Sequence, residues 1–281
     1  MRLSLDVSQH QLTWVQLLAR VRFAEEAGFE GAWVFDHFKP LYGDPAGPCL
    51  EAWTLLAALG SVTKRVRLGA LVTGVTYRHP AVLAAQIVTV DHASTGRLDI
   101  GMGAAWFQAE HQMFGITFPP TRERVTRLNE ALQVIDGLLT RDDVTFNGRY
   151  YTLENATYRP RPIQQPRPPI WVGASGTRMI EIAARQADVW HSFGSVAELE
   201  RKAALLDEAA SRAGRDPSTI LRSTNVSLSQ PWDELRRTTD QLAAAGFSSL
   251  IASWPSEGKA RLEEFVDRVM PELSATGPPD H

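Results

Sequence analysis

The 281-residue sequence contains a single cysteine, Cys49. A single cysteine excludes a disulfide within the chain. Because a low cysteine content is typical of proteins in a reducing compartment, we expect a cytoplasmic protein. The residues after Met1 lack the apolar run of a signal peptide, and no stretch approaches the ~20 apolar residues that a membrane helix needs. The 29 Lys and Arg nearly balance the 32 Asp and Glu, so neither nucleic acid nor a membrane surface is an expected partner.

The signatures of several catalytic classes are absent as well. The sequence has no G-x-S-x-G nucleophile elbow, no H-E-x-x-H zinc motif and no P-loop, and nothing around Cys49 resembles a catalytic thiol. Histidines recur near predicted strand ends, at His10, His37, His79 and His191. No cluster of carboxylates accompanies them, so we expect no metal site. A bound organic cofactor is therefore the expected agent of any chemistry, acting on a small-molecule substrate.

What the sequence does contain is one unit repeated eight times: a short apolar run, a loop and an amphipathic stretch. The runs expected to be strands are residues 2–7, 31–35, 66–72, 98–102, 170–172, 189–190, 220–228 and 249–252. The stretches expected to be helices are residues 12–27, 51–60, 80–90, 121–139, 177–186, 196–213, 232–245 and 258–270. This alternation requires a parallel sheet with helical crossovers. Eight units predict a single α/β domain, a (β/α)8 TIM barrel over residues 1–273.

One segment interrupts the repeat, because residues 140–169 have no helical pattern. We interpret this segment as an insertion between the fourth helix and the fifth strand. Asn147 and Gly148 are a strong hairpin signal, so we predict a hairpin in which they join strands 144–146 and 149–151. Residues 274–281, after the last helix, are expected to form a disordered tail.

Barrel enzymes place their chemistry on the loops that follow the strands, so the residues there are the candidates. Asp36 and His37 follow the second predicted strand. Such an Asp can simply cap a turn, but a histidine at a barrel mouth can move a proton near neutral pH, so both are candidate catalytic residues. Gly103 and Trp106 follow the fourth strand. There the backbone could approach a flat ring walled by the indole, although close packing of the strand end is the alternative.

The turn formed by Gly173, Ala174, Ser175, Gly176 and Thr177 follows the fifth predicted strand and opens a helix. Small residues at a helix N-terminus leave backbone N–H groups free at the positive end of the helix dipole, where phosphate binds well. A Gly-rich strand-to-helix turn is by itself a weak signal. Because the chain offers no other phosphate loop, we predict that these five residues hold a phosphate of the cofactor.

A set of motifs resembles the luciferase-like monooxygenase superfamily over nearly the whole chain, to about Ile251. The motifs are residues 68–74, 77–80, 89–98 and 101–103, Glu110, Gly115, Glu123, Arg124, Leu128, and residues 146–148 and 184–188. Within the superfamily, residues 35–38 and 103–107 are most similar to the branch of oxidoreductases that use the deazaflavin coenzyme F420. The resemblance therefore implies hydride transfer between coenzyme F420 and a small organic substrate, by a homodimeric enzyme.

The resemblance also implies roles for individual residues. Asp36 and His37 would lie beside the reactive part of the ring, and Leu71 and Val72, followed by Thr73, match a non-prolyl cis peptide that bulges against its back. The residues 173–177 would hold the phosphate, and Arg78, Arg161 or Arg178 could meet the anionic tail.

One departure from the branch bears on the substrate. Its sugar-phosphate dehydrogenases have a glutamate where this chain has Ala104, which argues against a sugar-phosphate alcohol. Two alternatives remain open at this point. One is a monooxygenase that uses flavin mononucleotide (FMN) in the same fold, and the other is a flavin- or deazaflavin-binding protein without turnover.

Overall fold

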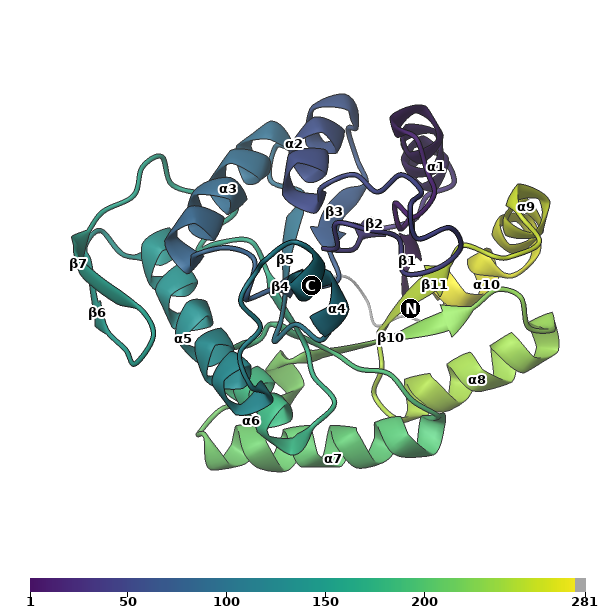
Figure 1. The fold of residues 1–281 in the computed structure, drawn as a ribbon. Helices are drawn as coiled ribbons and strands as arrows, with labels where there is room; N and C mark the ends of the chain where they lie inside the picture. The colour runs from purple at the N-terminus through teal and green to yellow at the C-terminus, as the bar shows by residue number, and fades with distance from the viewer. Residues whose placement is uncertain (276–281) are drawn as a thin grey trace.

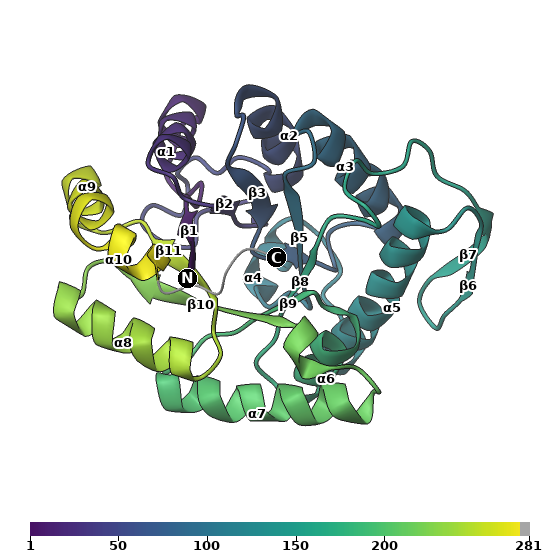
Figure 2. The same ribbon diagram turned by 180° about the vertical axis from the view of Figure 1, so that it is seen from behind.

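The computed structural model describes residues 1–275. At its centre eight parallel strands form a closed ring, with the helices outside it (Figures 1 and 2). The strands are β1 (Arg2–Asp6), β2 (Gly31–Val34), β3 (Arg67–Ala70) extended by β4 (Thr73–Gly74), β5 (Leu98–Gly103), β8 (Ile170–Gly173), β9 (Val189–His191), β10 (Leu221–Ser227) and β11 (Ser249–Ser253). Because β1 pairs with both β2 and β11, and β3 pairs with β5, the sheet has no open edge. The predicted (β/α)8 barrel is confirmed.

The helices begin where the sequence supplies caps. Thr13 and Ser195 each form a capping box, and His79 caps a helix that has Pro80 in its first turn. The helices are α1 (Trp14–Glu26), α2 (Ala52–Val62), α3 (Pro80–Ala93), α4 (Gln108–Met113), α5 (Thr121–Thr140), α6 (Thr177–Gln186), α7 (Val196–Arg212), α8 (Trp232–Ala244), α9 (Lys259–Arg268) and α10 (Met270–Ala275), with a 3-10 turn η1 (Pro217–Thr219). The short α4 was not predicted. It lies inside the ring of longer helices, over the strands (Figure 1).

The helix α10 also includes Ser274 and Ala275, the first two residues of the predicted disordered tail. The expectation of disorder is wrong for these two, because the last helix extends through them. The rest of that segment, residues 276–281, lies outside the described residues. Within the described part, no helix combines the length and apolarity needed to cross a membrane.

Two apolar clusters hold the barrel together. The larger fills the space between the strands and the surrounding helices. The smaller lies inside the ring and contains Trp33, Trp171, Val189 and Ile251. The rings of Trp33 and Trp171 pack with their centroids 4.5 Å apart. The interior of the barrel is thus filled by side chains rather than open from end to end, as is usual for this fold.

The predicted insertion forms a two-stranded hairpin of β6 (Val144–Asn147) and β7 (Thr152–Ala156), outside α3 and α5 (Figures 1 and 2). The predicted two-residue turn is wrong, because the connection spans Gly148 to Tyr151 and the second strand starts later. The cause is Glu130 on α5. Its carboxylate accepts the backbone N–H groups of residues 149, 150 and 151 at 2.9, 2.8 and 3.2 Å. These donors therefore bind a side chain instead of the opposite strand.

Candidate active site

Two adjoining pockets open at the C-terminal ends of the barrel strands. The first, of about 370 Å³, has a wall of backbone at Gly74, Gly103 and Gly173, and we call it the glycine pocket. The second, of about 470 Å³, has a ring on half of its lining residues, among them Phe35 and Trp254, and we call it the aromatic pocket. The two pockets share four residues, His37, Leu71, Trp106 and Phe193. A ligand in either pocket would therefore lie beside His37.

His37 is held by a buried carboxylate on α4. Its Nδ1 lies 2.9 Å from Oε2 of Glu110, whose side chain is fully buried, while 12% of the His37 side chain is exposed. The backbone N–H groups of Phe38 and Lys39 donate to Oε1 of Glu110 at 2.7 and 3.2 Å, and the Tyr77 hydroxyl donates to Oε2. Four donors thus converge on one carboxylate, and they join the β2–α2 loop, the β4–α3 loop and α4.

This arrangement determines which nitrogen of His37 is available. Burial alone raises the pKa of Glu110, but the hydrogen bonds from His37, Tyr77 and the Phe38 backbone outweigh it and lower that pKa. An ionised carboxylate can only accept hydrogen bonds, so Nδ1 of His37 bears the proton that Glu110 accepts, and Nε2 is the ring nitrogen that Glu110 does not engage. Burial and the neighbouring Glu110 raise the pKa of Tyr77, so its hydroxyl remains a donor. His37 therefore has Nε2 free to exchange a proton.

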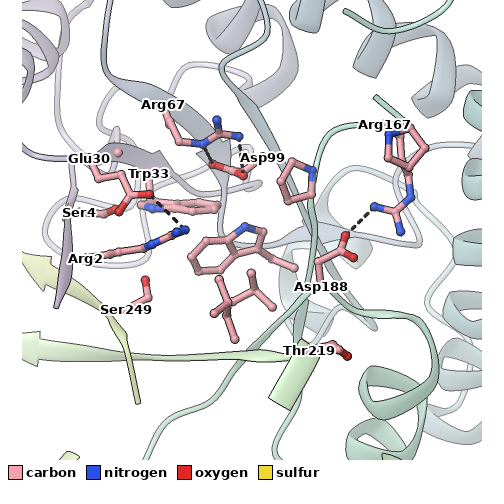
Figure 3. Close-up of a pocket in the computed structure, with 16 residues that line it drawn as sticks. Arg2, Ser4, Glu30, Trp33, Arg67, Asp99, Arg167, Asp188, Thr219 and Ser249 are labelled. Atoms are coloured by element: carbon pink, nitrogen blue, oxygen red, sulfur yellow. Dashed lines mark hydrogen bonds and ion pairs between the residues drawn. The ribbon is translucent and has the colours of Figure 1, made fainter. Parts of the chain in front are cut away.

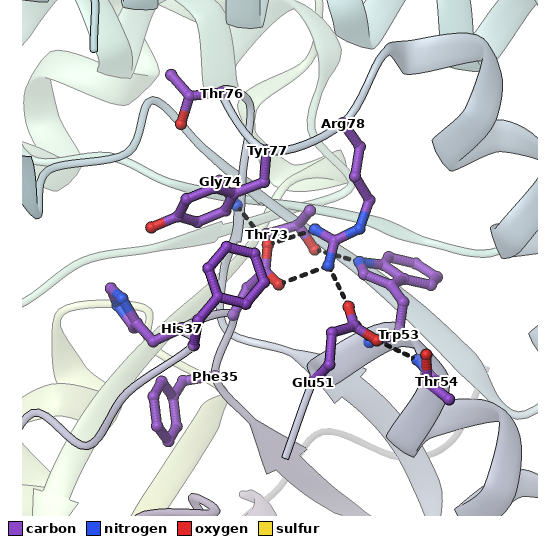
Figure 4. Close-up of polar contacts among 12 residues, drawn as sticks. Phe35, His37, Glu51, Trp53, Thr54, Thr73, Gly74, Thr76, Tyr77 and Arg78 are labelled. Carbon is purple, nitrogen blue, oxygen red and sulfur yellow. Dashed lines mark hydrogen bonds and ion pairs between the residues drawn. The ribbon is translucent and has the colours of Figure 1, made fainter. Parts of the chain in front are cut away.

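Asp36, the sequence neighbour of His37, belongs to a different network of hydrogen bonds. Its carboxylate forms two hydrogen bonds with Arg78, at 2.7 and 3.0 Å, and accepts the Gly74 backbone N–H at 3.0 Å. Arg78 also pairs with Glu51, which caps α2 by accepting the N–H groups of residues 53 and 54. In Figure 4 the His37 ring and the Tyr77 hydroxyl point away from the Arg78 guanidinium. Both carboxylate oxygens of Asp36 are thus engaged by fixed donors.

The back of the glycine pocket is formed by Val72. The peptide bond between Leu71 and Val72 is cis, as the resemblance implied. A Cβ atom added to Gly103 would lie 2.5 Å from Cγ2 of Val72, and one added to Gly173 would lie 3.3 Å from the same side chain. The glycines therefore provide the space that Val72 occupies, which leaves a smooth wall suited to a planar ring.

The predicted phosphate turn lies at one end of this wall. Gly176 is the N-cap of α6. At this N-terminus no side chain caps the N–H groups of the first turn. A Cβ atom at Gly176 would meet nothing within 4 Å. Open space in front of free N–H groups at a helix N-terminus fits an anion such as phosphate.

The structure brings most of the predicted site residues together. Nine of them line the glycine pocket, namely Asp36, His37, Leu71, Val72, Gly103, Trp106, Gly173, Ala174 and Ser175. Thr73 does not, because its hydroxyl accepts the Trp53 indole N–H at 3.1 Å inside the protein. Gly176 and Thr177 are exposed beyond the pocket lining.

Several site residues had no role from sequence reasoning. Met179, His191 and Phe193 also line the glycine pocket, and Glu110 orients His37. The one available signal was position, because His191 and Phe193 stand at the C-terminal end of β9 and Met179 lies in the first turn of α6, the helix that follows β8. Of the three arginines considered for the cofactor tail, Arg78 is committed to Asp36, and Arg161 donates to Leu138 at the C-terminal end of α5 and to Asp142. Arg178, on α6, lies beside the phosphate turn.

A separate cavity of about 550 Å³ lies at the opposite end of the barrel (Figure 3). Its charged side chains are paired around its rim: Arg2 with Glu30, Arg67 with Asp99, and Arg167 with Asp188. Such closed pairs at the N-terminal ends of the strands fit a stabilising role, since barrel enzymes place their chemistry at the other end. Within residues 1–275, no group of three or more His, Cys, Asp or Glu side chains could hold a metal ion.

Comparison with known proteins fits this site and fold. An F420-dependent glucose-6-phosphate dehydrogenase of Kineococcus radiotolerans is 36% identical over 73% of this chain and 61% of its own. An F420-dependent hydroxymycolic acid dehydrogenase of Mycobacterium tuberculosis is 32% identical over 76% of this chain and 59% of its own. The chain thus spans about three fifths of the length of these relatives.

Solved structures and a family model extend the likeness to almost the whole chain. An F420-dependent secondary alcohol dehydrogenase, solved with an F420-acetone adduct, superposes with a TM-score of 0.87 over 97% of this chain and 98% of its own. At 20% identity this likeness shows the shared fold alone. The family model of the luciferase-like monooxygenases matches residues 1–267. The chain belongs to the luciferase-like monooxygenase family.

Proposed function

We propose that the protein is an oxidoreductase that transfers a hydride between coenzyme F420 and a small organic substrate. The observation that supports this most directly is the glycine pocket, which lies between a free helix N-terminus and the unblocked Nε2 of His37. Its smooth wall over Val72 suits a planar ring, and the α6 N-terminus suits the attached phosphate. Relatives that are more than 30% identical are named as F420-dependent dehydrogenases, which favours F420 over FMN.

The deazaflavin supplies the hydride chemistry when it is bound, and the chain supplies position and proton transfer. Val72 would contact one face of the ring and so fix which face meets the substrate. Residues 173–177 would hold the phosphate. Trp106 and Phe193 stand at the border of the two pockets and would exclude water from the reacting atoms.

We assign proton transfer to His37. In the oxidation of an alcohol, the hydroxyl proton would pass to Nε2 of His37 as the hydride leaves the carbinol carbon and the carbonyl double bond forms. In the reduction of a carbonyl, the same nitrogen would return the proton to the oxygen. Glu110 would stabilise the imidazolium that forms in the oxidation.

Asp36 is assigned a positioning role rather than proton transfer. Its two oxygens already accept three hydrogen bonds from Arg78 and Gly74. A carboxylate held this way fixes the β2–α2 loop, and with it the position of His37.

Fluorescence titration of the purified protein with oxidised F420 tests the proposal. Saturable quenching that excess FMN does not reverse is the expected result. Displacement of F420 by FMN at equal concentration would favour the flavin monooxygenase alternative, and no binding of F420 would refute the proposal. Tight binding without turnover of any alcohol or carbonyl compound would favour the cofactor-binding protein without catalysis.

We also propose that the protein is a cytoplasmic homodimer. Val62 on α2 and Val82 on α3 are 43% and 55% exposed, and α2 and α3 pack against each other, so they offer apolar surface to a second copy. Sedimentation velocity over a concentration series tests the dimer, and a monomer at every concentration would refute it.

A further inference from the structure

The aromatic pocket bears on which substrate reaches His37. It adjoins the glycine pocket through His37, Leu71, Trp106 and Phe193. If the cofactor ring occupies the glycine pocket, the aromatic pocket is the space left for the molecule that exchanges hydride with it. Its volume of about 470 Å³ lies within the range of about 300–1,000 Å³ that is usual for ligand pockets.

Half of the sixteen residues that line this pocket carry a ring, and the others include Asp6, Ser8, Arg20, Asn225 and Ser253. His10 stacks on Phe35 with ring centroids 3.9 Å apart, and Tyr42 lies 5.3 Å from His10. Three large apolar side chains that line this pocket remain exposed to solvent: Tyr42 by 76%, Trp106 by 64% and Phe193 by 56%. They come from three separate loops, after β2, β5 and β9. Large exposed apolar groups that converge on one pocket mark a surface that an apolar ligand covers.

The pocket also lacks an excess of positive charge. Among the described residues that line it, the only Lys or Arg is Arg20, which stacks over the Trp254 ring at 4.2 Å and is attracted to Asp6, a second lining residue. Burial, and to a smaller extent the neighbouring His37, lowers the pKa of His10 to about 4, so His10 is neutral at neutral pH. Burial likewise lowers the pKa of His191, in the glycine pocket, to about 4. A phosphate dianion in this pocket would face one guanidinium, that of Arg20, with the carboxyl group of Asp6 in the same lining, whereas phosphate sites use several cations or free N–H groups.

We infer that the substrate of this site is an uncharged, mainly apolar secondary alcohol and its ketone, rather than a sugar phosphate. The inference rests on the proposed function. It is consistent with Ala104, which presents a methyl group and no carboxylate to the glycine pocket. In the reaction the carbinol hydride goes to the deazaflavin, the hydroxyl proton goes to Nε2 of His37, and the ketone forms. The alkyl or aryl substituents of the alcohol lie against Tyr42, Phe193 and Trp254.

The test compares 1-phenylethanol, cyclohexanol and glucose 6-phosphate with oxidised F420, and acetophenone and cyclohexanone with reduced F420, by F420 absorbance. The expected result is a kcat/KM for the apolar compounds at least about tenfold above that for glucose 6-phosphate. Saturation-transfer NMR of acetophenone with the enzyme–F420 complex gives a readout independent of turnover.

Two variants examine the pocket itself. Tyr42→Ala should raise KM for 1-phenylethanol by about tenfold through lost ring contact, and leave F420 affinity unchanged. Val15→Ala, which truncates an apolar side chain 74% exposed on α1, is the matched control and should change neither quantity.

The outcomes separate the two proposals. Failure to bind F420 would overturn the proposed function. F420 binding together with preference for glucose 6-phosphate, or with no turnover of any apolar pair, would overturn the substrate assignment alone. An unchanged KM in Tyr42→Ala would also count against the assignment.

Discussion

The clearest prediction concerns Glu110, because its carboxylate determines the proton position on His37. In Glu110→Gln the side chain keeps its shape, but the amide adds two N–H donors where the carboxylate had only acceptors. The amide oxygen can still accept from the backbone of Phe38 and Lys39, which now meet Oε1 at 2.7 and 3.2 Å. The amide nitrogen then faces Nδ1 of His37 and donates to it. The proton of His37 moves to Nε2, and the lone pair that takes up the substrate proton is lost.

The size of the effect follows from these contacts. Loss of a positioned general base typically costs about 10²–10⁴-fold in rate, so we expect kcat for alcohol oxidation to fall by that factor. The F420 dissociation constant should change little, because Glu110 does not line the glycine pocket. Loss of hydrogen bonds to a buried charge should lower stability by about 1.5–3 kcal/mol, which corresponds to about 3–12 °C in Tm.

Glu130→Gln is the matched control. Glu130 is also a buried glutamate, 7% exposed, and accepts three backbone N–H groups, but it lies beside the hairpin loop. Its variant should lose similar stability and keep its turnover. Long-range proton–nitrogen NMR of the histidine side chains, with His37 assigned from a His37→Gln sample, reports the tautomer directly, and Glu110→Asp should recover part of kcat. If Glu110→Gln keeps Nδ1 protonated, or turns over as fast as Glu130→Gln, the reasoning is refuted.

Three further predictions follow from the geometry. Gly176→Asp should abolish F420 binding by placing a carboxylate at the phosphate turn, while Gly176→Ala, whose Cβ meets nothing within 4 Å, should leave it within about threefold; equal affinities in titration would place the phosphate elsewhere. Gly103→Ala should lower stability by about 1–3 kcal/mol, because its Cβ would lie 2.5 Å from Val72; unchanged urea unfolding would contradict this. Burial lowers the pKa of His191 from 6.5 to about 4, so the unfolded chain binds more protons between these values. Stability should therefore fall as the pH drops from about 6.5 towards 4, by up to about 3 kcal/mol, and His191→Gln should flatten the dependence measured by urea unfolding.

The architecture was predictable because barrel periodicity is a local property of the sequence. Each strand and helix showed its own apolar pattern and caps, and eight repeats left one closed arrangement. The errors occurred where a distant side chain overrides a local signal. Asn147 and Gly148 have the composition of a tight hairpin turn, yet Glu130 captures the next three N–H groups and lengthens it. Nothing within the hairpin sequence indicates that contact.

The site was only partly predictable for the same reason. Gly103 and residues 173–177 could be selected because they directly follow predicted strands, where barrel enzymes place their chemistry. The partner of His37 does not stand out, since Glu110 is 73 residues away in the chain and lies on α4, which has too little periodicity to predict. Thr73 was expected near the cofactor by its place after the third strand, but it faces Trp53 because side chains alternate along the backbone.

Two pairs of sequence neighbours each supply one residue to the buried ion pair and one to the network around His37. Asp36 and His37 are adjacent, and so are Tyr77 and Arg78, but the contacts join Asp36 to Arg78, and Tyr77 to Glu110 beside His37. Because successive side chains point to opposite sides of an extended backbone, each loop gives one residue to a buried ion pair and one to the pocket. The ion pair fixes both loops, and the fixed loops leave His37 with one free nitrogen at the border of the two pockets. Removing either partner of the ion pair should therefore lower the rate of proton transfer by His37, although neither Asp36 nor Arg78 forms a hydrogen bond with His37. Asp36→Asn tests this, because it should lower kcat while the His37 tautomer, reported by NMR, stays as in the wild type.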